Sequence, residues 1–422
     1  MVILRTPNIP PRPRLARMPS SPIQKILFGS PGTGKSYRVK NQIIPNQLNI
    51  ADQSNIITTV FHPEYTYGDF MGKLMPLTDD NQKVSYRYYT GHFLKALGRA
   101  YTNIISAHRD YESAKNKVKK EYTLKLRIAR ELASNDKLNT SQEKELDRLY
   151  DLVEKPNPKN VALVIDELNR GNSAAIFGTV FQLLDRAKDG WSEYPITISD
   201  LENIGLLKEA GFSTYYRSDS SDKKYKSQGK ECKQDEYNEA LELVFDDLEE
   251  DEKVSLLENK IKLPPNLSIL ATMNTSDNSI YFMDSAFKRR WDWEFVNIED
   301  DNQRNVVSGR KINLYNNDTY LSYLWNDFVD KLNEFIRSHY KTVRKIEDKQ
   351  IGYFFINEET ITEEHIKNKL MFFIWDSVFS NNRKPLTELL GMTERDLVTF
   401  GQFTQKDIVQ KFVEKIMGFG NV

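Results

Sequence analysis

A glycine-rich loop carries the strongest chemical signal in the chain. Residues 29–36 read Gly-Ser-Pro-Gly-Thr-Gly-Lys-Ser, the complete P-loop pattern, and follow the short apolar run 26–28. Glycines let backbone N–H groups converge on phosphate oxygens, the lysine brings positive charge to the β- and γ-phosphates, and the hydroxyl can bind Mg²⁺. We therefore predict that a nucleoside triphosphate binds at Gly29, Ser30, Pro31, Gly32, Thr33, Gly34, Lys35 and Ser36.

Two carboxylates follow another apolar run. The segment 161–165 reads Val-Ala-Leu-Val-Ile and is followed by Asp166 and Glu167. Carboxylates at the end of a buried strand need a charged partner, because burying them alone is costly. With a P-loop nearby, we expect Asp166 to bind Mg²⁺ together with Ser36, and Glu167 to polarise the attacking water.

A third group of polar residues follows the apolar run 267–272. Asn274 would lie at the tip of a strand, where its amide can hold water near the γ-phosphate. Farther on, Lys288, Arg289 and Arg290 follow Asp284. These bases are either a solvated helix end or an arginine finger that completes the site of a neighbouring subunit, which would imply a ring.

Taken together, these segments resemble the McrB-type AAA+ GTPases, the motor subunits of modification-dependent restriction systems. The resemblance runs in order from about residue 26 to 355 and lies in the P-loop and in segments 61–70, 165–172, 273–277, 286–291 and 350–355. The segment 273–277, Met-Asn-Thr-Ser-Asp, with the basic helix after it, is much more specific than a P-loop.

The resemblance implies roles for individual residues. Asn274 matches the family's signature asparagine and Asp277 its acidic companion. Asp284 and Arg289 match residues presented to the neighbouring subunit, Arg290 is their neighbour, and Arg170 follows the acidic pair. The chain departs from the family at Asn278, where an arginine is usual, and at Tyr353, where a histidine is usual.

The resemblance also implies an activity and partners. We expect Mg²⁺-dependent hydrolysis of GTP, or of ATP, by a hexameric ring that drives DNA translocation for an McrC-like nuclease. The P-loop reads phosphates rather than purines, so the choice between GTP and ATP stays open. Alternatives are a MoxR-like AAA+ ATPase that remodels proteins, or a regulatory scaffold that binds nucleotide and barely hydrolyses it.

Strands alternating with helical stretches predict an α/β fold with a doubly wound parallel sheet, that of an AAA+ P-loop NTPase with a C-terminal helical lid. We expect strands at 26–28, 56–60, 161–165 and 267–272. The expected units are a basic Pro-rich arm (1–25), a nucleotide-binding domain (26–297) and a mostly helical lid (298–422), with helices at 321–337 and 366–379.

Two insertions interrupt the nucleotide-binding domain. Apolar residues at helical spacing predict a basic helical hairpin at about 95–155, with a turn at 134–136 and a capping box at Thr140 and Glu143. This hairpin is either a DNA or subunit contact or a plain solvated hairpin. The second insertion, at about 200–260, ends in an acidic segment at 246–252, and short strands at 195–198 and 261–263 are expected to pair around it.

Composition adds limits. The chain has 59 Lys and Arg against 60 Asp and Glu, so attraction to nucleic acid must come from local patches. A single cysteine excludes a disulfide scaffold, and no apolar run is long enough to span a membrane, which predicts a cytoplasmic protein. Only about 25 residues precede the first strand, so we expect another subunit to recognise target DNA. The aromatic residues of segment 61–70 are either core packing or a binding surface.

Overall fold

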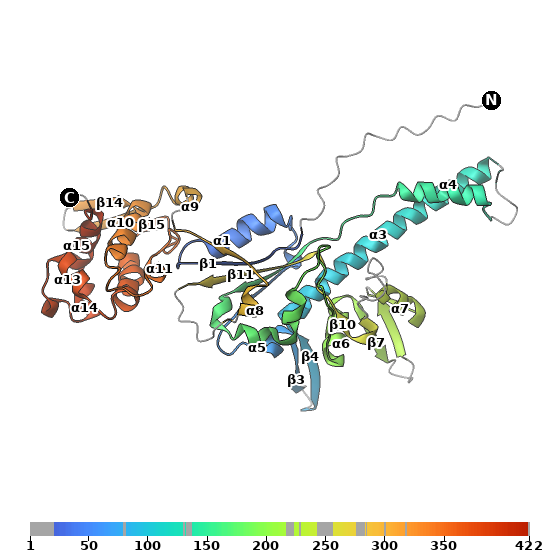
Figure 1. Ribbon diagram of the computed structural model, residues 1–422, viewed down its shortest axis with the longest axis horizontal. Coiled ribbons are helices and arrows are strands. Elements are labelled where there is room, and N and C mark those ends of the chain that lie inside the picture. The colour runs from blue at the N-terminus through green and yellow to red at the C-terminus, as the bar shows by residue number, and fades with distance from the viewer. Residues whose placement is uncertain are drawn as a thin grey trace, which may run out of the picture.

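A five-stranded parallel sheet forms the centre of the protein (Figure 1). The computed structural model describes residues 21–78, 82–129, 131, 137–216, 223–227, 229–242, 256–275, 283, 285–298, 301–316 and 319–420. The five strands are β1 (Gln24–Gly29), β2 (Ile56–Val60), β5 (Val161–Asp166), β11 (Leu267–Asn274) and β12 (Asp292–Phe295). They lie in the order β12-β1-β11-β5-β2, and all neighbours are parallel, so their carboxyl ends share one edge.

The four strands predicted from apolar runs are present. The fifth strand, β12, was not predicted, because two of its four residues, Asp292 and Glu294, are charged. It lies at an edge of the sheet, where such residues are tolerated: Glu294 accepts from Lys25 at 2.7 Å and pairs with Arg38 at 2.6 Å.

Both faces of the sheet are covered, as the apolar strands require. On β5, Val161, Leu163 and Ile165 pack into the same core as α3 (His92–Ile128). The alternate residues Ala162 and Val164 pack into a second core with η1 (Val39–Gln47). The protein is therefore a mixed α/β protein built on a central parallel sheet.

Short elements connect the strands of this domain. They are α1 (Lys35–Arg38), η2 (Gln53–Asn55), α2 (Tyr67–Phe70), η3 (Leu168–Arg170), α5 (Ser173–Phe177), η4 (Gly178–Leu184) and α8 (Ser285–Lys288). A hairpin of β3 (Gly72–Thr78) and β4 (Val84–Thr90), which we did not predict, projects from the body beside α2 (Figure 1).

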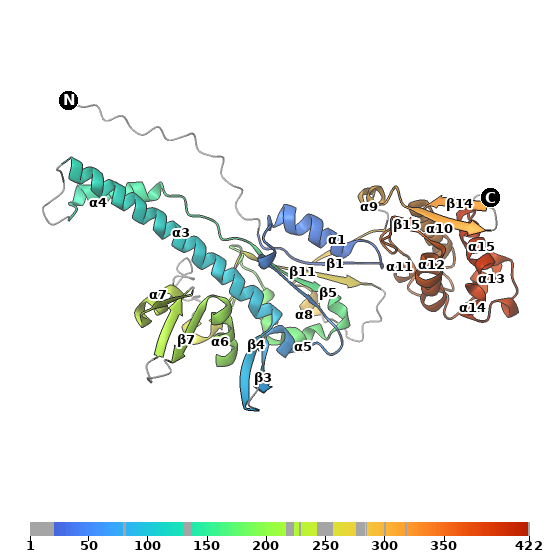
Figure 2. The same cartoon turned by 180° about the vertical axis from the view of Figure 1, so that it is seen from behind.

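The first insertion consists of two helices. α3 runs far beyond the sheet, and α4 (Thr140–Asp151) lies against its distal half (Figures 1 and 2). Lys115 Nζ lies over the rings of Tyr111 and Tyr150, which joins the two helices. The predicted cap is wrong by one residue: Asn139 Oδ1, not Thr140, accepts from the N–H groups of Ser141 and Gln142. The turn predicted at 134–136 lies outside the described residues.

The second insertion contains a small sheet of its own. Its elements are α6 (Asp200–Glu209), β7 (Phe212–Tyr216), β8 (Lys223–Ser227), β9 (Lys230–Cys232), α7 (Gln234–Glu242) and η7 (Leu256–Glu258). The predicted strand pair around it exists as β6 (Ile196–Thr197) and β10 (Lys260–Ile261), which are antiparallel. The acidic segment 246–252 lies outside the described residues.

The C-terminal part has a separate core and mixes helices with strands. Its sheet has the order β14-β13-β15, formed by β13 (Lys311–Asn316), β14 (Thr319–Leu324) and β15 (Thr360–Ile361). The helical elements are α9 (Asp301–Val306), α10 (Trp325–Ser338), α11 (Ile346–Lys349), α12 (Glu363–His365), η8 (Ile366–Met371), η9 (Ile374–Val378), α13 (Lys384–Leu390), η10 (Glu394–Asp396), α14 (Phe400–Phe403) and α15 (Lys406–Met417).

One helix prediction in this part needs correction. Residues 321–324, predicted as the start of a helix, belong to β14. Leu321 and Tyr323 alternate toward the core with period two, which is the strand pattern, and α10 begins only at Trp325. The predicted helix at 366–379 is present as the helical elements η8 and η9.

Candidate functional site

The P-loop joins the carboxyl end of β1 to α1. Gly32 and Gly34 both have a φ of 75°, in the left-handed region that favours glycine. The Lys35 ammonium turns back along the loop and donates to the carbonyl oxygens of Gly29 and Ser30, at 3.0 and 2.8 Å. Its charge therefore lies inside the loop, where phosphate oxygens bound by the loop's N–H groups would gather.

Three strands bring their polar residues to Asp166. Its Oδ1 accepts from Ser36 Oγ of α1 at 3.2 Å and from Thr272 Oγ1 of β11 at 2.7 Å. The β5–β11 register, in which Ala271 pairs with Ile165, places Thr272 beside Asp166. The hydroxyl and carboxylate oxygens are the ligands that Mg²⁺ prefers.

The donor set fits Mg²⁺ better than a metal held by protein alone. Within the described part of the chain, no three His, Cys, Asp or Glu side chains gather as a metal site. Mg²⁺ is usually held by one or two carboxylates together with waters and substrate phosphates. Ser36 and Asp166 are thus the residues that would hold it, with the remaining ligands coming from nucleotide and water.

Glu167 has an unusual backbone. Its φ of 57° and ψ of 44° lie in the left-handed region, which costs a non-glycine residue about 1–3 kcal/mol. The conformation turns the chain sharply after β5 and aims the carboxylate toward β11, where Oε1 accepts from Asn274 Nδ2 at 3.3 Å. Strain of this kind is concentrated at functional sites.

Asn274 is held from two sides. Asn169 is 2% exposed, and its Nδ2 donates to the Asn274 carbonyl oxygen at 3.0 Å. The next N–H group, of Thr275, donates to the Gly29 carbonyl oxygen at 3.2 Å. Asn169 Oδ1 and Thr275 Oγ1 are buried and have no hydrogen-bond partner among the described residues, so both can bind a water or a ligand here.

Thr272 and Asn169 were not predicted as site residues. A hydroxyl at the end of an otherwise apolar strand, next in space to the acidic strand, was the available signal for Thr272. Using that signal requires the strand order, which puts β11 beside β5. Asn169 stood inside a quoted segment, but its contact with Asn274 depends on the turn at Glu167.

Replacing Thr272 with valine is expected to raise the Mg²⁺ concentration for half-maximal NTP turnover about fivefold. The change removes one hydrogen bond that orients Asp166, worth about 1 kcal/mol. Phosphate release measured over an Mg²⁺ titration checks this, and Thr272→Ser should keep the wild-type value. Equal Mg²⁺ dependence in the valine and serine variants would contradict a positioning role.

The structure separates the two arginines of the basic run. Arg289 is exposed at the end of α8. Arg290 is turned inward: its side chain is 8% exposed, pairs with Asp185 at 2.6 Å, and stacks on the ring of Phe181. Consecutive helical residues point about 100° apart, which explains the difference. Arg290 is thus engaged within its own chain, and its placement does not support the catalytic role that we predicted for it.

The remaining predicted residues are placed as follows. Arg170, at the end of η3, is exposed, as is Lys288. Asp277 and Asp284 lie outside the described residues, so their roles stay predictions.

Replacing Arg290 with methionine is expected to lower the free energy of unfolding by about 1–3 kcal/mol, because Asp185 loses its charged partner. Urea denaturation of the whole chain measures the effect. The matched control is Arg289→Met, one residue away and exposed, which should change stability by less than about 0.5 kcal/mol. Equal losses in both variants would contradict the structural role of Arg290.

The C-terminal part touches the P-loop through its backbone. The N–H groups of Gly352 and Phe354 donate to the carbonyl oxygens of Pro31 and Gly32, at 2.8 and 2.9 Å. Ser30 Oγ donates to the Glu347 carbonyl oxygen at 2.6 Å. A Cβ on Gly352 would collide with the backbone of Gly32, so this approach requires glycine. Tyr353, where the family has histidine, points away: its hydroxyl donates to Asp330 in the lid.

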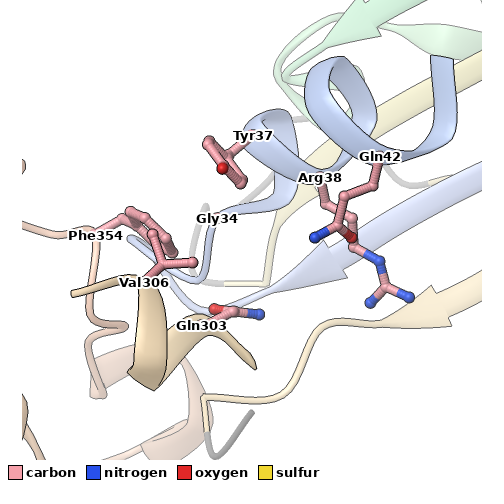
Figure 3. A pocket seen from close by; sticks show the side chains of 7 residues that line it. All are labelled: Gly34, Tyr37, Arg38, Gln42, Gln303, Val306 and Phe354. Atoms are coloured by element: carbon pink, nitrogen blue, oxygen red, sulfur yellow. The ribbon is translucent and has the colours of Figure 1, made fainter. Parts of the chain in front are cut away.

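A hollow of about 440 Å³ lies between the P-loop helix and the lid. Figure 3 shows Tyr37 and Phe354 facing each other at one end, with Arg38 and Gln42 along α1. The Tyr37 and Phe354 rings stack with centroids 5.5 Å apart. Flat rings with amide and guanidinium groups nearby can hold a planar base beside a phosphate loop.

The aromatic segment 61–70 is core packing. Phe61 and Phe70 are fully buried, and Tyr65 is 7% exposed. The Tyr65 hydroxyl bonds to His92 Nδ1 at 2.8 Å, and burial raises the pKa of Tyr65 to about 12. These side chains fix α2 against α3 instead of lining a binding surface.

Comparison with known proteins gives one informative relative. The chain is 25% identical over 417 residues to YdiS of Bacillus subtilis strain 168, a component of the Type II restriction enzyme BsuMI. The aligned region covers 93% of this chain and 88% of that protein, so the similarity includes both insertions and the lid. No protein-family model matches the chain. Within the described residues, every helix is too short or too polar to cross a bilayer.

Proposed function

We propose that the chain is the nucleoside-triphosphatase subunit of a restriction system, with GTP as the favoured substrate and ATP as the alternative. The observation that carries the proposal is the meeting of three strand ends around Asp166, where Ser36, Thr272 and Asp166 share hydrogen bonds. Ligands of open parallel sheets bind at this edge, outside the carboxyl ends of the strands.

Each residue then has a chemical task. The P-loop N–H groups and Lys35 bind the phosphates, and the bound Mg²⁺, held by Ser36 and Asp166, neutralises charge on them. Glu167 accepts a proton from the attacking water, while Asn274 orients both that water and the Glu167 carboxylate. Arg289 reaches the γ-phosphate bound by the next subunit, which requires a closed ring, proposed to be a hexamer.

The restriction role rests on the relative. YdiS is named as a component of a restriction enzyme, and the similarity runs along nearly the whole chain. We propose that hydrolysis drives DNA translocation and licenses an McrC-like nuclease supplied by a partner protein. The 25% identity supports the broad role more strongly than the nucleotide or the partner.

The test is phosphate release from GTP and from ATP, with and without the protein encoded beside this chain. We expect Mg²⁺-dependent GTP turnover that the neighbour stimulates, and cleavage of DNA only by the combination. Rapid ATP turnover without any GTP turnover would overturn the GTPase assignment and favour a MoxR-like ATPase that remodels proteins.

A further inference from the structure

A second hollow lies wholly within the lid, away from the nucleotide elements. Its volume is about 860 Å³. The wall formed by residues 342–349 contributes Arg344, Lys345 and Lys349. The opposite wall, formed by residues 377–382, contributes hydroxyl and amide groups, from Ser377, Ser380, Asn381 and Asn382. We call this hollow the lid cavity.

The lid cavity is strongly basic. Three of its lining side chains are cationic and none is a carboxylate. The basic character continues on both flanking segments, since Lys341 precedes one wall and Arg383 and Lys384 follow the other. Because the chain as a whole has a net charge of −1, this is a local concentration of positive charge.

The floor of the cavity is rigid and apolar. Val343, Val378 and Phe379 are buried, and the Phe379 ring packs against Phe335 of α10 with centroids 5.7 Å apart. The polar side chains above this floor are therefore anchored to the lid core. A ligand that enters would meet cations and neutral donors whose backbone positions are already fixed.

We propose that the lid cavity binds backbone phosphates of a nucleic acid. Arginine and lysine accompanied by serine and asparagine donors are the usual partners of phosphate and sugar oxygens. The extension of the charge onto Lys341, Arg383 and Lys384 fits a chain of phosphates better than a single anion. Tyr340, two residues before the cavity wall, is 65% exposed and offers a ring on which a base can stack.

The cavity is connected to the P-loop by a short path. Lys349 ends α11, and within this helix Glu347 accepts the hydrogen bond from Ser30 of the P-loop. Three residues after Lys349, Gly352 donates to Pro31. Binding of nucleic acid is therefore expected to change NTP turnover; this second consequence, unlike the binding itself, rests on the proposed function.

The experiment is fluorescence anisotropy of the full-length chain with labelled duplex and single-stranded DNA of unrelated sequences, over a series of salt concentrations. The test variant is Arg344→Gln/Lys349→Gln. The matched control is Lys406→Gln/Lys415→Gln, which removes two cations from the exposed side of α15 in the same lid. Thermal melting confirms that each variant is folded, and Arg344→Lys/Lys349→Arg tests charge without loss of volume.

We expect the wild type and the control to bind DNA without sequence preference, and the test variant to bind at least about tenfold more weakly. The slope of log affinity against log salt should become less steep by about 1.5, the value for two lost phosphate contacts. The charge-conserving variant should keep most of the binding. DNA-free NTP turnover should be unchanged in the test variant, while stimulation by DNA should be lost.

Two results would overturn the inference. One is wild-type affinity for DNA in the test variant. The other is an absence of DNA binding by the wild type, in which case the cavity would serve an acidic protein segment instead. A chain that binds DNA through this cavity but shows no NTP turnover would refute the proposed function and leave the inference intact.

Discussion

Glu167→Gln is expected to lower NTP turnover by about 10²–10⁴-fold, the usual contribution of a general base. Glutamine keeps the size of the side chain and can still accept a hydrogen bond from Asn274, but it cannot take a proton from water. The nucleotide should therefore bind normally and stay bound unhydrolysed. Phosphate release and the amount of triphosphate recovered from the purified complex measure the two effects.

The control for this experiment is Glu143→Gln, the same chemical change at an exposed position of α4, far from the P-loop (Figure 1). It should turn over NTP at the wild-type rate. If Glu167→Gln also hydrolyses at that rate, the left-handed turn at Glu167 serves the fold alone. The chain would then be better described as a nucleotide-binding scaffold.

Arg289→Ala is expected to reduce turnover by about 10³-fold or more, the effect of losing an arginine finger. Because the finger would act on the neighbouring subunit, two inactive variants should rescue each other. A subunit with Glu167→Gln still offers Arg289, and a subunit with Arg289→Ala still has Glu167. In an equal mixture of both, about a quarter of the interfaces combine the two intact residues, so up to about a quarter of wild-type turnover should return.

Mixing separately purified variants under conditions that allow subunit exchange measures this rescue. The neighbouring Arg290 provides the contrast, because it is already bound to Asp185 within its own chain. Mixing Glu167→Gln with Arg290→Met should restore nothing beyond the turnover of Arg290→Met itself. A mixture of Glu167→Gln and Arg289→Ala that stays inactive would contradict action between subunits.

The chemistry at the ends of the strands could be predicted from sequence because it depends on local patterns. A buried apolar run followed at once by Asp166 and Glu167 defines both a strand and the place of its carboxylates. Gly32, Gly34 and Lys35 define a loop conformation together with its ligand. The structure brings these segments to one edge, as the parallel arrangement requires.

The supporting residues depend on contacts between distant segments. Thr272 touches Asp166 only because β11 lies beside β5, and Gly352 touches the P-loop only because the lid folds onto it. Arg289 and Arg290 are the same residue type in adjacent positions, so no composition or spacing rule separates the exposed one from the buried one. The β3–β4 hairpin escaped prediction because Leu74 and Tyr86, about half exposed or more, give no clear two-residue alternation.

The measurement that tests the central claim most directly is phosphate release from GTP and ATP by the purified chain, in Mg²⁺ and in EDTA, beside the Lys35→Ala variant. The account predicts turnover of at least one of the two nucleotides by the wild type in Mg²⁺ alone, and loss of nearly all of it in EDTA and in Lys35→Ala, because Lys35 would bind the transferred phosphate. Equal rates for the wild type and Lys35→Ala, or rates unaffected by removing Mg²⁺, would contradict it.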